Sequence, residues 1–109
     1  MNKIYISAKL FKRWKNGLSG KKRGLNLLLK DHSTMFKTTV WQETADWAEE
    51  QLSNGDEIQL TGECHGIWEN DYGQAIEIVE PEIMAVNTTS IVIKELTKEF
   101  KIKKDNDRE

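Results

Sequence analysis

Residues 35–70, MFKTTVWQETADWAEEQLSNGDEIQLTGECHGIWEN, decide the fold because two alternating runs flank one amphipathic segment almost without spacers. Successive side chains of a strand point to opposite faces, so the first run, residues 35–41, predicts a half-buried strand. The inward set would be Phe36, Thr38 and Val40, and the outward set would be Met35, Lys37, Thr39 and Trp41. This pattern leaves an indole and a lysine on the outer face.

A short helix is predicted over residues 44–52, between the two runs. Thr44 is a suitable capping residue, Asp46 places an acid in the first turn, and Asn54-Gly55 is a typical stop signal. The expected buried stripe consists of Ala48, Leu52 and either Ala45 or Trp47.

The second alternating run places Ile58, Leu60 and Gly62 on one face and leads into Trp68. The next residues, Glu-Asn-Asp-Tyr-Gly at 69–73, favour turns and predict the tip of a β-hairpin. Trp68 and Tyr72 are therefore expected where a hairpin leaves the body of the domain. Exposed rings at such a place usually have a partner, either a nucleic acid or a neighbouring subunit.

The remaining chain supplies three further strands. Residues 2–14 alternate, with Ile4, Ile6, Ala8 and Leu10 inward, and residues 74–80 form a returning strand that residues 81–86 complete. Residues 25–31 form the second strand, and residues 35–41 are the third. If these two strands pair, three side chains of the second strand lie beside the outward set of the third: Asn26, Leu28 and Lys30.

Strand, short helix, strand and hairpin follow one another in the order of an oligonucleotide-binding (OB) barrel, whose helix covers one end. We therefore predict a mostly β protein with a five-stranded OB-fold barrel and one short helix between strands 3 and 4. Trp47 is expected to pack on the barrel end. Residues 1–86 would form this domain, and residues 87–109 would be a C-terminal extension that is partly helical or disordered.

The chain resembles the bacterial and phage single-stranded DNA-binding protein family over roughly its first 86 residues. Residues 2–10 are similar to the first strand of that family, with Ala8 where a glycine is usual. The other matching segments are Val40-Trp41, residues 44–52, Gly55, residues 58–62 and residues 68–73. The resemblance implies an OB fold, binding of single-stranded DNA in replication, recombination and repair, and a homo-oligomer.

Several residues depart from the family pattern. Met35 stands where some members have a stacking aromatic, and the loop before it is short. Near Trp68, where the family usually has arginine or lysine, this chain has Glu63, Glu69 and Asp71. The C-terminus lacks the terminal Pro-Phe through which members recruit replication enzymes, so that role is not carried over.

Composition excludes several other classes of protein. The 109 residues suit one domain, and a mean hydropathy of -0.65 without a long apolar run indicates a soluble, cytoplasmic protein with no membrane span or signal peptide. Cys64 is the only cysteine, and neither a metal site nor a Cys-His dyad can be assembled from it with His32 and His65. No catalytic motif or phosphate loop is present, so we expect neither an enzyme nor a bound cofactor.

Charge is strongly segregated along the chain. Residues 1–43 contain ten Lys or Arg and two acids, whereas residues 44–93 contain eleven acids and no Lys or Arg. One surface can therefore attract phosphates although the net charge is -2. The alternative explanation is that the charged residues segregate along the chain only because strands and helices use different residue types.

The predicted nucleic-acid site combines this charge with the outward aromatic rings. A basic loop rich in glycine supplies Lys12, Arg13, Lys21, Lys22 and Arg23, and the sheet supplies Lys9, Lys30, Lys37, Met35 and Thr39. Trp41, Trp68 and Tyr72 are the expected base-stacking rings, and Trp14 either stacks on a base or covers the barrel end. Packing of Trp41 in a subunit interface or under the first loop is the competing interpretation.

The primary ligand is expected to be single-stranded DNA, and RNA remains open because no residue identifies a contact to a 2′-hydroxyl. The alternative function is an OB-fold protein-interaction module that docks a replication or recombination protein through the aromatic hairpin and the acidic half of the chain.

Overall fold

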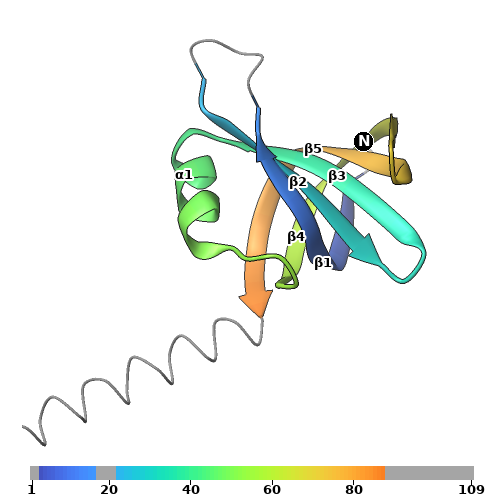
Figure 1. The fold of residues 1–109 in the computed structure, drawn as a ribbon, viewed down its shortest axis with the longest axis horizontal. Coiled ribbons are helices and arrows are strands. Elements are labelled where there is room, and N and C mark those ends of the chain that lie inside the picture. The colour runs from blue at the N-terminus through green and yellow to red at the C-terminus, as the bar shows by residue number, and fades with distance from the viewer. Residues whose placement is uncertain (1–2, 17–21, 88–109) are drawn as a thin grey trace, which may run out of the picture.

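The computed structural model describes residues 3–16 and 22–87, which form a closed β-barrel with one helix (Figure 1). The strands are β1 (Lys3–Lys15), β2 (Gly24–Asp31), β3 (Thr34–Trp41), β4 (Glu57–Asn70) and β5 (Gly73–Asn87), and α1 (Gln42–Gln51) lies between β3 and β4. Around the barrel the strand order is β1-β2-β3-β5-β4, and only the β3–β5 pair is parallel. The predicted fold class is confirmed. Lys21 and the predicted extension beyond Asn87 lie outside the described residues.

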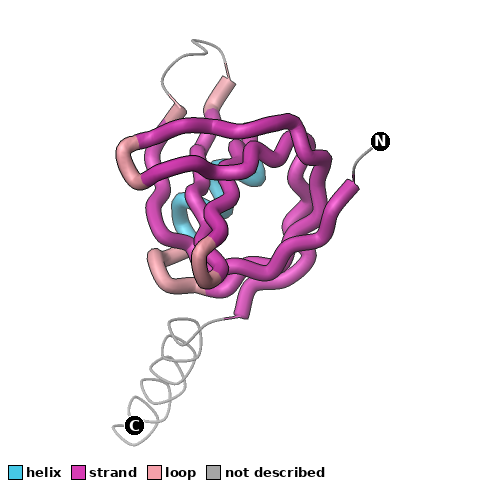
Figure 2. The backbone as a smooth tube through the Cα atoms, turned by 90° about the vertical axis from the view of Figure 1, so that its right-hand side faces the viewer, coloured by secondary structure: helices cyan, strands magenta, loops and turns pink. Residues whose placement is uncertain are grey.

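The core forms where the inward sets of the strands meet the helix. Figure 2 shows the strands as a ring with the helix behind it. The buried side chains that fill the ring include Ile6, Leu10, Leu27, Leu29, Val40, Ile58, Leu60 and Ile78, and α1 adds Ala45 and Ala48. The inward sets that alternation predicted for residues 4–10, 36–40 and 58–62 therefore lie in this core or pack against it.

Helix α1 differs from the prediction at its N-terminal end. It begins at Gln42, directly after β3, so Trp41 occupies the capping position without a side-chain cap and Thr44 lies inside the first turn. The backbone N–H of Gln42 donates to the carbonyl oxygen of Arg23 at 2.8 Å, which ties this helix end to the start of β2. A contact between distant residues thus replaces the local cap that the sequence suggested.

The prediction that Trp47 packs on the barrel end is wrong. Ala45 and Ala48 are buried and Leu52 follows them on the same stripe, whereas Trp47 is 41% exposed. Because residues two apart in a helix lie on nearly opposite faces, burial of Ala45 turns Trp47 outward. Within the described ranges, no helix has the length and apolar character needed to span a membrane.

A β-bulge at Phe11 changes the direction of the side chains in the second half of β1. Leu10 pairs with Leu29, but the next pair is Lys12 with Leu28, so one residue of β1 is skipped. The extra residue reverses the alternation. Lys12 and Trp14 consequently point outward, and Arg13 points toward the barrel end.

The β4–β5 hairpin turns at Asp71 and Tyr72, as predicted. The Asn70 side chain stabilises this turn by accepting a hydrogen bond from the Tyr72 N–H at 2.8 Å and donating one to the Gly73 carbonyl at 2.7 Å. Strand β5 then continues through Pro81 to Asn87. Pro81 falls at a register shift between the pairs Thr61–Glu82 and Glu63–Val79, a position where a strand tolerates the missing N–H.

Candidate nucleic-acid interface

A small apolar cluster lies on the outer face of the sheet, beneath the β4–β5 hairpin. Leu28 is 1% exposed and Met35 is 9% exposed, and both contact Ala75 in a cluster that Trp14 and Trp68 cover. The sequence placed Leu28 and Met35 on an exposed platform, and this expectation is wrong. They do point outward from the barrel, but the hairpin folds back over them, so Met35 offers no free surface to a base.

Trp14 and Trp68 stack on each other above this outer cluster. Their ring centroids are 5.8 Å apart, and the ring planes are inclined by 24°. The bulge at Phe11 turns the Trp14 side chain to the outer face of the sheet, where it meets Trp68 of β4. The Lys37 ammonium lies 5.7 Å from the Trp68 ring centroid, within range of a cation–π contact. The outer cluster thus supports a platform of two stacked indoles with a lysine beside it.

The tip of the hairpin contacts β1. The rings of Phe11 and Tyr72 meet edge to face, with centroids 5.2 Å apart, and the Lys12 ammonium donates to the Tyr72 hydroxyl at 3.2 Å. Lys30 lies 5.9 Å from the Phe11 ring centroid. Phe11 is therefore part of the interface although the sequence did not single it out. Its outward position in the alternation was the available signal.

A groove of about 510 Å³ lies between the hairpin and β1, and we call it the hairpin groove. Its aromatic lining is Trp14, Trp68 and Tyr72, its cation is Lys12, and Leu28 contributes to its apolar lining. Glu69 and Asp71 line the hairpin side, so one wall of the groove is acidic. Further along the same face, Lys9, Phe11, Lys30 and His32 line a second groove of about 540 Å³.

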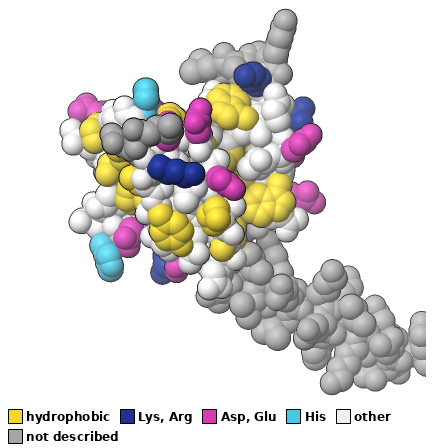
Figure 3. All heavy atoms as spheres, turned by 180° about the vertical axis from the view of Figure 1, so that it is seen from behind, with side chains coloured by type: hydrophobic (Ala, Val, Ile, Leu, Met, Phe, Trp, Pro, Cys, Tyr) yellow, Lys and Arg dark blue, Asp and Glu magenta, His cyan; other side chains and the backbone are white. Residues whose placement is uncertain are grey.

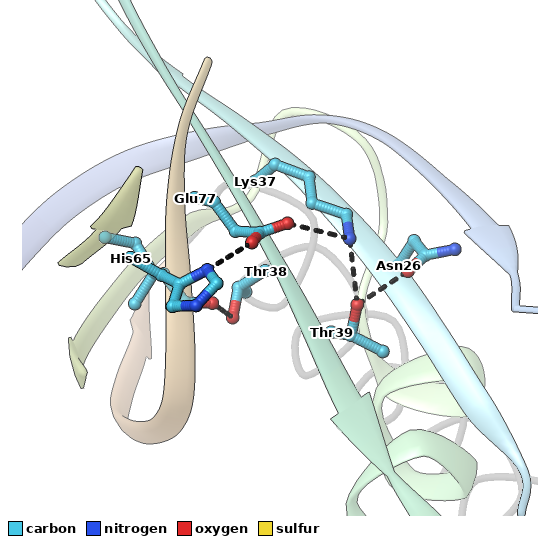
Figure 4. A network of polar contacts seen from close by, with 7 residues as sticks. Asn26, Lys37, Thr38, Thr39, His65 and Glu77 are labelled. Carbon is cyan, nitrogen blue, oxygen red and sulfur yellow. Dashed lines mark hydrogen bonds and ion pairs between the residues drawn. The ribbon is translucent and has the colours of Figure 1, made fainter. Parts of the chain in front are cut away.

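Lys37 belongs to a polar network at the β3–β5 seam, which Figure 4 shows. Its ammonium donates to Thr39 Oγ1 at 3.3 Å and lies 3.8 Å from a carboxylate oxygen of Glu77, whose other oxygen is 2.9 Å from His65 Nδ1. Thr39 Oγ1 donates in turn to Asn26 Oδ1 at 2.6 Å. The Lys37 side chain is only 15% exposed, so the network fixes this ammonium in place. No pattern in the sequence had indicated the roles of Glu77 and His65.

Trp41 lies at the opposite end of β3 and is 39% exposed. It pairs with Gly24, and its ring packs so closely on Gly24 that a Cβ added there would lie 2.7 Å from the indole. Glycine at this position lets the ring lie on the backbone of β2. Lys37, Thr39 and Trp41 line one recess, so the indole shares the outer face with the lysine.

Two of the arginines predicted for the site are engaged with α1. Arg13 donates to the carbonyl oxygens of Ala48 at 3.0 Å, of Glu49 at 3.1 Å and of Leu52, and so places a positive charge at the C-terminal end of the helix. Arg23 forms a bidentate salt bridge with Asp46, with N–O distances of 2.9 and 3.1 Å. The hydrogen bond to Asp46 and its negative charge raise the pKa of the Arg23 guanidinium above its ordinary value.

The remaining predicted cations lie along the outer face or beside it. Lys9 pairs with Lys30 across β1 and β2, Lys12 lies in the hairpin groove, and Lys22 is exposed just before β2. Among the described residues, no group of three His, Cys, Asp or Glu side chains is arranged to hold a metal ion.

Comparison with known proteins identifies similarity of fold. No family model matches the sequence, and no curated protein matches it either. Among solved structures, the crystal structure of the SSB domain of a Synechococcus sp. protein is similar to this chain with a TM-score of 0.57 and 15% sequence identity. The match covers 81% of this chain and 96% of that chain. The barrel with one helix between β3 and β4 is therefore an OB fold, as in that structure.

Proposed function

We propose that this protein binds single-stranded DNA without catalysis, by stacking bases on its outer aromatic rings and contacting phosphates through nearby lysines. The observation that carries the proposal is the hairpin groove, where Trp14, Trp68 and Tyr72 lie together with Lys12. Aromatic rings accept the face of any base, and lysines attract the backbone whatever its sequence. The similarity of fold to an SSB domain supports the same ligand class.

The proposed path of the strand follows the cations of the outer face. It runs from Lys9 and Lys30, past Lys12 and the hairpin groove, to Trp41. Arg13 and Arg23 are left out of the proposed phosphate contacts, because their guanidinium groups are already engaged with α1. The acidic hairpin wall would keep the phosphates on the β1 side of the groove.

The proposed setting is DNA replication, recombination or repair, in which single strands need to be coated regardless of their sequence. We extend the proposal to a homo-oligomer, which the resemblance of the sequence to the single-stranded DNA-binding protein family implies. Size-exclusion chromatography with light scattering, with and without a dT oligomer, would test this extension. A monomer under both conditions would contradict it.

Titration of the full chain with a dT oligomer tests the binding proposal. We expect quenching of tryptophan fluorescence, because bases would stack on indoles, and an affinity that falls as salt rises, because bound phosphates release counterions. An RNA oligomer of uridine serves as the competitor that separates DNA from RNA. Absence of quenching at low salt, with absence of binding by filter retention, would reject the proposal.

A second candidate function is a protein-interaction module, which a different surface favours. Trp47 of α1 and Met84 of β5 are 41% and 57% exposed, and with Pro81 and Ile83 they line a groove of about 570 Å³. Figure 3 shows apolar side chains with acidic and basic ones among them on the side of the molecule opposite to the view in Figure 1. A replication or recombination protein with a basic, apolar segment would suit this surface. Pull-down of such a partner by the intact protein, but not by a Trp47→Ala variant, would support this function.

A further inference from the structure

The strands β3 and β5 separate beyond their last parallel pair, Thr38 with Ile78, and leave a recess of about 180 Å³ between them. We call it the seam recess. Cavities of about 150 Å³ can hold one benzene ring, so the seam recess has the size for the six-membered ring of one base. Trp41 lines it from β3, and Glu80 lines it from β5.

Trp41 gives the seam recess a surface on which a base can stack. One part of its ring packs on the Gly24 backbone, yet the residue remains 39% exposed. The ring is therefore supported by the sheet while offering free surface to a ligand. Stacking on an indole accepts all four bases, so any choice among them has to come from the polar groups around the ring.

Those polar groups are one ammonium and two carboxylates. The Glu77 carboxylate is engaged by Lys37 at 3.8 Å and by His65 at 2.9 Å. Lys37 also lines the seam recess; one of its three N–H donors reaches Thr39 Oγ1, one is directed toward Glu77, and the ammonium lies 5.7 Å from the Trp68 ring centroid. Glu80 is exposed, and its carboxylate contacts no side chain in the part of the chain that the structure describes.

A free carboxylate and an ammonium beside one ring discriminate between bases by their hydrogen-bonding edges. Guanine presents two neighbouring N–H donors, N1–H and the N2 amine, next to the O6 acceptor. A carboxylate can accept from both donors, and an ammonium can donate to O6. Adenine and cytosine each place a ring-nitrogen acceptor next to their amine, and thymine has one N–H between two carbonyls. These three bases would turn an acceptor toward the carboxylate.

We propose that the seam recess binds one guanine base of a single strand, with the ring on Trp41, N1–H and the N2 amine on Glu80, and O6 near Lys37. This inference rests on the proposed function and adds a base preference at one position to an otherwise sequence-tolerant track. It makes Glu80 and Lys37 specificity-determining residues.

The backbone at Glu80 provides a suitable test variant. Its φ of +52° is a left-handed conformation that costs energy for a residue with a side chain and is adopted readily by glycine. Glu80→Gly therefore removes the carboxylate while favouring the native backbone, and Glu80→Gln removes the charge with little change in shape. Glu82→Gln is the matched control, because Glu82 lies on the same strand but lines the Trp47 groove.

The experiment compares the affinities of the full chain for a dT oligomer and for the same oligomer with one central dG, dA or deoxyinosine. We expect the dG oligomer to bind about 5- to 100-fold more tightly than dT, because a two-pronged base contact discriminates on this scale. Deoxyinosine, which lacks the N2 amine, should lose most of the gain, and dA should show no comparable gain.

Both Glu80 variants should lose the dG gain while binding the dT oligomer as before, and Glu82→Gln should retain the gain. Equal affinities for dT and dG, or a dG gain that persists in both Glu80 variants, would overturn the guanine assignment while leaving single-strand binding intact. Failure of every oligomer to bind would reject the proposed function and the guanine assignment together.

Discussion

Trp68 and Trp47 both lie at the surface of the barrel, but their surroundings differ. Trp68 stacks on Trp14, covers the buried Leu28 and Met35, and has the Lys37 ammonium 5.7 Å from its ring centroid. Trp47 is 41% exposed beside Met84 and Glu82, and no lysine or arginine of the described chain lines its groove. The first surface combines rings and cations with the acidic wall of Glu69 and Asp71, and the second combines apolar side chains with an acid and no cation of the described chain.

This difference shows that an exposed indole is not by itself a nucleic-acid site. Stacking supplies affinity for bases, but the phosphates of the same strand have to be accommodated, and acidic neighbours repel them. The outer face meets both requirements through Lys12 and Lys37. The Trp47 groove meets only the first, and therefore suits a protein partner better than a polynucleotide.

The largest expected effect concerns the support beneath Trp68. Leu28→Ala should lower the free energy of unfolding by about 2–5 kcal/mol, because it leaves a cavity in the fully buried outer cluster. The counterpart on the other surface, Met84→Ala, should change it by no more than about 0.5 kcal/mol, because Met84 is 57% exposed. Denaturant unfolding of both variants measures the difference. Similar losses of stability would show that the outer cluster contributes no more than an exposed side chain.

The second effect concerns stacking itself. Trp68→Ala should weaken binding of a dT oligomer by about 1–3 kcal/mol, the energy of one stacked base, whereas Trp47→Ala should leave the affinity unchanged. Fluorescence anisotropy of a labelled oligomer is the measurement, since it does not depend on the tryptophan that is removed. Equal losses in the two variants would abolish the distinction between the surfaces.

The smallest expected effect is on the salt dependence of binding, and it distinguishes a lysine that contacts a phosphate from a lysine that only adds positive charge to the protein. Lys12→Gln should reduce the slope of log affinity against log salt by about 0.7, the contribution of one phosphate contact in a single strand. Lys15→Gln is the control, because Lys15 is paired with Glu49 at 3.5 Å and does not line the hairpin groove. An unchanged slope for Lys12→Gln would remove this lysine from the proposed track.

The sequence predicted the topology well because its strongest signals are local. The alternation of Phe36, Thr38 and Val40 reflects the two-residue period of a strand, and Asp71-Tyr72 lies at the turn that the composition indicated. The helix start was misplaced, because Thr44 satisfied a local capping rule while the backbone of Arg23 provided the actual partner for Gln42. Trp47 was misplaced because two stripes of the helix were compatible with its sequence.

The candidate site was predictable in its residue types but not in its contacts. Trp14, Trp68, Lys12 and Lys37 were all recognised as candidates, yet their mutual placement depends on the bulge at Phe11 and on the hairpin folding over Leu28. Arg13 was expected beside the phosphates, but the same bulge turns it toward the carbonyl groups of α1.

The sequence by itself determined the order of the strands and, except beyond the Phe11 bulge of β1, which residues face inward, because both depend on local alternation and turn chemistry. Only the tertiary structure decided which outward side chains remain accessible. Leu28 and Met35 have outward positions in their strands, but burial of their apolar surface beneath Trp14 and Trp68 is a contact between segments that lie far apart in the chain. A period of two residues carries no information about such a contact.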